Sequence, residues 1–149
     1  MKFFAAIAAL ALAVVASAQQ PTWTNCAVGT ADLVISSFTV APYPLCINQN
    51  VCASGTGILS TPVVAGGTLA ITGRFAGRVV YSDNHDLCTL TGAQGYPCPI
   101  ATTLTSITIC VLVKNTAPAG INVALTVQAT NGNNHVLFCQ AATVTASNC

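Results

Sequence analysis

The sequence predicts a single all-β domain, built as a sandwich or barrel of seven to eight short strands. Short runs rich in β-branched and aromatic residues alternate with Gly, Pro and Asn turn signals, a pattern typical of all-β proteins. After the first 18 residues, no stretch sustains a helical period with caps at its ends. No internal repeat or linker divides the remainder, so residues 19–149 are expected to form one domain.

Turn signals bound each expected strand. Pro42 and Pro44 end the expected strand at residues 33–40, and Ala65-Gly66-Gly67 separates the strands at 57–64 and 68–71. The strand at 74–81 is expected to be bent and interrupted at Gly77. An Asn-Gly turn at residues 131–132 joins the last two runs into the clearest hairpin of the sequence. The expected strands are residues 33–40, 57–64, 68–71, 74–81, 104–113, 121–130 and 135–144.

The N-terminus has the features of a secretion signal. Lys2 gives it a positive start, residues 3–15 form an unbroken apolar run, and Ala16-Ser17-Ala18 supplies a small-x-small cleavage site. The apolar run is too short to span a bilayer, so a retained membrane anchor is not expected. We therefore expect a signal peptide at residues 1–18, a mature domain at residues 19–149, and secretion to the extracellular space.

Charged residues are very sparse. Without a basic patch there is nothing to neutralise phosphates, so nucleic-acid binding is disfavoured. Electrostatic attraction to an anionic membrane is disfavoured for the same reason. Beyond Lys2, the charged residues are Arg74, Arg78 and Lys114 against Asp32, Asp83 and Asp86.

Eight cysteines follow the signal, and an even number in a secreted domain predicts four disulfides. Zinc binding is the alternative, but the sequence has no Cys-x-x-Cys pair and its two histidines stand apart. Spacing alone leaves 105 possible connectivities for eight cysteines. The cysteines are Cys26, Cys46, Cys52, Cys88, Cys98, Cys110, Cys139 and Cys149.

The sequence lacks the familiar catalytic motifs. There is no Gly-x-Ser-x-Gly elbow, no His-Glu-x-x-His motif and no phosphate-binding glycine loop. Asp83 and Asp86 are the only close pair of carboxylates, and with Ser82 and His85 they form a cluster that could suggest a metal site or a triad. We interpret this cluster as a solvated loop, because neighbours on a strand face opposite ways. His135 follows a tight turn and is expected to be exposed. The sequence therefore predicts a protein that is not an enzyme and that needs no metal or cofactor.

Two functions from different classes fit a neutral, apolar, disulfide-linked β-domain. The first is a carrier that holds an apolar small molecule between its sheets, which requires apolar area and only one or two polar groups at the mouth. The second is a structural or surface-active protein without a specific ligand. Hydrophobins and helical lipid-transfer proteins also carry eight cysteines, but both contain adjacent Cys-Cys pairs, which this sequence lacks.

Several motifs in register resemble the ML-domain (lipid-recognition) family. Asp86-Leu87-Cys88, followed by Tyr96-Pro97-Cys98-Pro99-Ile100, resembles that family's Asp-Leu-Cys…Cys-Pro-Leu loop. The resemblance covers Trp23 to about Val144 and is nearest to the secreted phosphatidylglycerol/phosphatidylinositol transfer proteins, with the lysosomal sterol-carrier branch a step further off. The other matching segments are Trp23-Thr24-Asn25-Cys26, Asp32-Leu33-Val34-Ile35, Val40-Ala41-Pro42-Tyr43-Pro44, Pro118-Ala119-Gly120 and Val136-Leu137-Phe138-Cys139.

The resemblance implies an immunoglobulin-like two-sheet β-sandwich with a lipid cavity between the sheets. It implies disulfides Cys26–Cys139 and Cys88–Cys98, and Cys46–Cys52 would match a bridge of the sterol-binding branch. Cys110 and Cys149 lie outside the family's usual set, and we pair them because no other cysteines remain.

The resemblance further implies a protein that binds and transfers a phospholipid, sterol or fatty acid. Such a protein would contact membranes transiently and is expected to be a monomer. The sequence does not choose among these lipids. Expected lipid-binding residues are Val80 and Tyr81 at the pocket entrance, Leu112, Pro118 and Ile121 around the other lip, and Phe38 and Phe75 in the wall.

Overall fold

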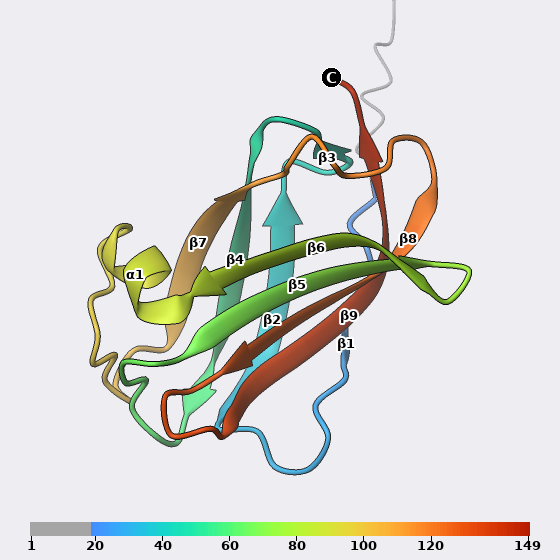
Figure 1. The fold of residues 1–149 in the computed structure, drawn as a ribbon. Helices are drawn as coiled ribbons and strands as arrows, with labels where there is room; N and C mark the ends of the chain where they lie inside the picture. The colour runs from blue at the N-terminus through green and yellow to red at the C-terminus, as the bar shows by residue number, and fades with distance from the viewer. Residues whose placement is uncertain (1–18) are drawn as a thin grey trace, which may run out of the picture.

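The computed structural model describes residues 19–149, and the expected signal peptide at residues 1–18 lies outside the described part of the chain. Two antiparallel sheets stack face to face in these residues, which confirms the all-β prediction (Figure 1). Seven longer strands and two short ones make up the sandwich in residues 19–149. The strands are β1 Thr24–Asn25, β2 Leu33–Ala41, β3 Leu45–Cys46, β4 Asn50–Leu59, β5 Thr68–Phe75, β6 Arg78–Asp86, β7 Ser106–Leu112, β8 Asn122–Thr130 and β9 Val136–Ser147.

The larger sheet has the strand order β1-β9-β8-β5-β6, and β3 pairs in parallel with β9. The smaller sheet has the order β2-β4-β7. Strands β6 and β7 are therefore edge strands of different sheets. A short helix, α1 (Leu87–Gly92), follows β6 directly (Figure 1), and the Gln94 side chain just beyond it is hydrogen-bonded to the Cys110 backbone of β7.

Side chains alternate between the inside of the sandwich and solvent, as expected for strands covered on one face. On β5, Leu69 and Ile71 are buried together with Gly73, while their neighbours are more exposed. On β9, Leu137 and Val144 contribute to the two apolar clusters that fill the space between the sheets. No helix in the described residues is both long enough and apolar enough to cross a membrane.

Three parts of the expected strand pattern are wrong. Strand β4 starts at Asn50, well before the expected strand at 57–64, and Ser60 to Val63 lie beyond its end. The expected strand at 74–81 is a hairpin, because Ala76 (φ 48°) and Gly77 (φ 79°) form a tight turn between β5 and β6. Helix α1 was not expected; Asp86 caps it by accepting a hydrogen bond from the Thr89 amide at 2.7 Å.

Four disulfides link the described residues. Two are the pairs Cys26–Cys139 and Cys88–Cys98 that the resemblance implies. The expected pairs Cys46–Cys52 and Cys110–Cys149 are wrong, since Cys46 is bonded to Cys149 and Cys52 to Cys110.

Sheet pairing explains the correct partners. Cys52 lies directly opposite Cys110 in the β4–β7 ladder. Parallel pairing of β3 with the end of β9 sets Cys46 opposite Ser147, which brings it next to the C-terminal Cys149. Neither arrangement can be read from distances along the chain.

A buried asparagine joins the β4–β5 loop to the β8–β9 turn. The Asn131 side chain is 1% exposed; its oxygen accepts from the Val64 and Gly132 amides, and its nitrogen donates to the Pro62 carbonyl. A β-carbon on Gly132 would lie 1.9 Å from the Ala65 carbonyl oxygen, so the two loops approach too closely for any side chain there. His135, at the end of this turn, is exposed as expected.

Candidate functional site

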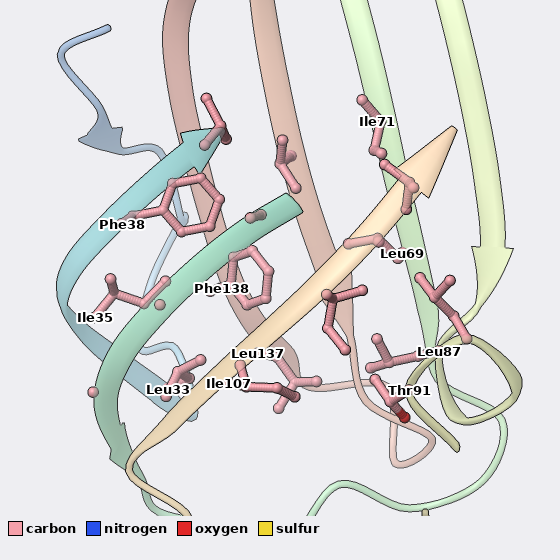
Figure 2. Close-up of a pocket in the computed structure, with 18 of the residues that line it drawn as sticks. Leu33, Ile35, Phe38, Leu69, Ile71, Leu87, Thr91, Ile107, Leu137 and Phe138 are labelled. Atoms are coloured by element: carbon pink, nitrogen blue, oxygen red, sulfur yellow. The ribbon is translucent and has the colours of Figure 1, made fainter. Parts of the chain in front are cut away.

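A cavity of about 200 Å³ lies between the two sheets. Figure 2 shows Leu33, Ile35 and Phe38 of β2 on one side and Leu69 and Ile71 of β5 on the other. Both sets come from strand positions that alternate toward the sandwich interior. Further lining residues labelled in Figure 2 are Ile107 of β7, Leu137 and Phe138 of β9, and Leu87 and Thr91 of α1.

The cavity wall is almost wholly apolar. Among the described residues that line it, none is charged, and the polar side chains are mainly hydroxyls. Such a wall favours hydrocarbon over ions or water, because an unpaired polar group buried in it would lose its hydration without replacement. The hydroxyl-bearing residues are Thr56, Tyr81, Thr91, Thr105 and Ser106.

The cavity reaches solvent along edge strand β7. Leu112, the last residue of β7, lines the cavity and is 51% exposed. Thr105 and Ser106, at the other end of β7, also line it and are exposed. Because β6 and β7 belong to different sheets, no ladder of backbone hydrogen bonds closes this side of the sandwich.

A polar cluster spans this side of the sandwich. Asp83 shares the inward face of β6 with Tyr81, and its side chain is only 1% exposed. Lys114, which follows β7, forms an ion pair with Asp83, and His85 Nε2 lies 2.8 Å from the other Asp83 oxygen. The backbone amide of Lys114 also donates to the Tyr81 hydroxyl at 3.4 Å. These contacts tie β6 of one sheet to the segment after β7 of the other.

The pKa directions follow from these contacts. Burial would raise the pKa of Asp83, but hydrogen bonds from Lys114 and His85 outweigh it and hold the pKa below its ordinary value. The same bond to Asp83 raises the pKa of Lys114. Burial raises the pKa of Tyr81, so its hydroxyl stays protonated. The expectation that residues 83–86 form a solvated loop is therefore wrong: they lie on β6, and Asp83 is buried.

Three of the seven expected lipid-binding residues line the cavity: Phe38, Tyr81 and Leu112. The other four lie outside its lining. Phe75 ends β5 and is 48% exposed, and Val80 is the extra residue where the β5–β6 register shifts. Pro118 and Ile121 lie in the segment between β7 and β8.

Most of the wall was missed by the sequence reasoning, although part of it left a signal. Ile107, Ile109 and Val111 alternate along β7 and all line the cavity. Their period of two marks one face of a strand, and that face could have been assigned to the interior. Leu87 and Leu90 of α1 left no such signal, because a helix of six residues is too short to show a period.

In residues 19–149, no group of three or more His, Cys, Asp or Glu side chains is placed to hold a metal ion. The fold and the cavity define a two-sheet β-sandwich with an apolar binding space between its sheets. A family model described as the ML domain matches residues 20–146, so the chain belongs to the ML-domain family. This confirms the resemblance found in the sequence. Members of this family bind lipids and are not enzymes.

Solved structures show the same fold. The chain is similar to a Niemann-Pick type C2 protein from the Japanese carpenter ant, at 12% identity over 85% of this chain and 99% of that chain, with a TM-score of 0.66. It is similar to chicken MD-1 complexed with lipid IVa, at 12% identity over 83% of this chain and 86% of that chain, with a TM-score of 0.52. It is also similar to the C-terminal domain of wzt, at 10% identity over 87% of this chain and 79% of that chain, with a TM-score of 0.54. No curated protein matches the chain by sequence.

Proposed function

We propose that this protein is a secreted carrier that binds the hydrocarbon part of a phospholipid, sterol or fatty acid between its two sheets and transfers it without covalent chemistry. The observation that carries the proposal is the apolar cavity, which has no charged lining residue among those described and is open along β7. Each methylene moved from water into such a space contributes about 0.8 kcal/mol, so an acyl chain supplies ample driving force without any charge.

Uptake requires the walls to move apart. The cavity of about 200 Å³ is below the range of about 300–1,000 Å³ that is typical of small-molecule sites. Edge strands β6 and β7 can separate without breaking a backbone ladder, because none joins them. The contacts that join the two sides include those of Lys114 with Asp83 and Tyr81, and the two hydrogen bonds between the Gln94 side chain and the Cys110 backbone of β7.

Four disulfides support the proposed secretion, because such bonds persist in oxidising compartments. The ligand and the secretion are tested together by native mass spectrometry of protein purified from its own secretion medium. We expect a protein whose chain begins at Gln19 with one lipid bound, and organic extraction then identifies the lipid class. Protein that is free of lipid and takes up none from mixed liposomes would contradict the carrier function and favour the surface-active one.

A charge at the mouth tests where the lipid enters. Leu112→Asp places a carboxylate on the half-exposed rim, where the folded state tolerates it, and we expect lipid uptake to fall at least tenfold. The matched control is Ile58→Asp, because Ile58 is 73% exposed on β4 and does not line the cavity. Equal uptake by the two variants would show that Leu112 is not at the entrance.

A further inference from the structure

The turn between β5 and β6 forms an exposed tip, defined here as residues 74–79. All six of its residues are exposed, and they include two arginines, Arg74 and Arg78. Two large apolar side chains accompany them: Phe75 is 48% exposed and Val79 is 52% exposed. Apolar residues of this size are commonly buried, so a short exposed segment with two of them next to two cations indicates an interaction surface.

The tip extends past the rest of its sheet. Strand β8 pairs with β5 only as far as Arg74, which lies opposite Ala124. Beyond that point, residues of the tip pair only with one another, and Figure 1 shows the hairpin projecting at the right of the sandwich. The cross-strand pairs are Arg74 with Val79 and Phe75 with Arg78. Each face of the projecting ribbon therefore carries one cation and one apolar side chain.

The tip is the positive end of the molecule. It holds two of the three cationic side chains in residues 19–149, and the third, Lys114, is paired with buried Asp83. Asp86, at the other end of β6, lies about 26 Å along the strand from Arg78 at about 3.3 Å per residue. That separation is about three Debye lengths at physiological ionic strength, so Asp86 does not offset the charge at the tip.

We propose that the tip docks on the anionic headgroup layer of a lipid bilayer, an inference that rests on the proposed carrier function. The arginines would bind lipid phosphates through paired N–H donors, while Phe75 and Val79 enter the interface below them. Tyr81 follows Val79 by two residues on β6, so docking brings the cavity mouth toward the bilayer. The few charges of the chain disfavour a general attraction to a membrane. Two of the three cationic side chains in residues 19–149 lie at the tip, so attraction to an anionic surface acts there.

The test measures flotation with vesicles of phosphatidylcholine containing about one third phosphatidylserine, compared with pure phosphatidylcholine. Each arginine near an anionic surface contributes about fivefold in affinity. The affinity of R74Q/R78Q for anionic vesicles should therefore fall about 25-fold, and its preference for them over neutral vesicles should disappear. R74K/R78K should retain that preference, because the charge is kept. F75S should weaken binding to both kinds of vesicle, whereas I58S, which removes a still more exposed apolar residue of β4, should not.

A second measurement separates this proposal from the carrier function. Lipid is delivered from cyclodextrin, without vesicles, and one-to-one loading is measured by native mass spectrometry. We expect R74Q/R78Q to load like the wild type from cyclodextrin and to load more slowly from anionic vesicles. Equal rates from vesicles would overturn docking and leave the carrier function intact, whereas no loading of the wild type from either source would contradict the carrier function itself. Wild-type protein that loads from cyclodextrin but does not float with either vesicle also overturns docking and points to a protein partner for the tip.

Discussion

The double variant Cys52→Ser/Cys110→Ser removes one disulfide without touching the cavity wall. Both sulfurs lie on the outer face of the smaller sheet, because their neighbours along β4 and β7, such as Val51 and Val111, line the cavity. The change therefore affects stability and should leave lipid uptake as it is.

The magnitude follows from the length of chain that the bond closes. Cys52 and Cys110 are separated by 58 residues, for which the chain-entropy model gives about 4 kcal/mol of stabilisation. This is an upper limit, because the other three bonds already restrict the unfolded chain. At roughly 4 °C per kcal/mol for a domain of this size, Tm should fall by up to about 16 °C.

Calorimetry under non-reducing conditions measures the loss, and native mass spectrometry measures the uptake. Loss of uptake in a folded double variant would show that the outer face of the sheet influences the cavity. A single variant checks the pairing itself: Cys52→Ser should free one thiol, and alkylation followed by peptide mapping should find the label on Cys110. A label on Cys46 would refute the pairing described here and support the pair expected from the sequence.

Two further predictions concern the loop junction and pH. Asn131→Ala should lower the free energy of unfolding by about 3 kcal/mol, because it leaves buried backbone groups of the β4–β5 loop without hydrogen-bond partners. Asn133→Ala, at an exposed position of the same turn, should lower it by well under 1 kcal/mol. Urea denaturation measures both. The pKa values of Asp83 and Asp86 are lowered in the folded state, so the stability that they contribute is present above their ordinary pKa and is lost as the pH falls below about 4. Tm should fall over this range, and less so in Asp83→Asn; an identical acid dependence in both proteins would contradict the role of Asp83.

Sequence reasoning located most of the strands, because alternation along a half-covered strand is a local property. It missed the start of β4, whose glycines resemble turn signals. Gly57 serves packing instead: a β-carbon there would lie 2.4 Å from the Val34 carbonyl oxygen of β2. The turn between β5 and β6 was missed because Ala76 adopts a positive φ there, which alanine rarely does.

The site was predicted less well than the fold, for a related reason. The mouth lies between edge strands of two different sheets and the wall is assembled from strands of both, so the site depends on how the sheets stack. Tyr81 and Leu112 were found through the family resemblance, and both line the cavity. Asp83 was interpreted as solvated because its partner Lys114 lies across the sandwich, 31 positions away along the chain, where no local pattern connects them.

The disulfide connectivity has a topological consequence for a protein exposed to proteases. The bond Cys26–Cys139 spans nearly the whole domain, and Cys46–Cys149 covers the stretch from Cys139 to the C-terminus. A single cut of the backbone anywhere between Cys26 and Cys149 therefore leaves both pieces covalently joined. A nick in a loop would not release a fragment, and the strands that form the two sheets would stay tethered around whatever lies between them.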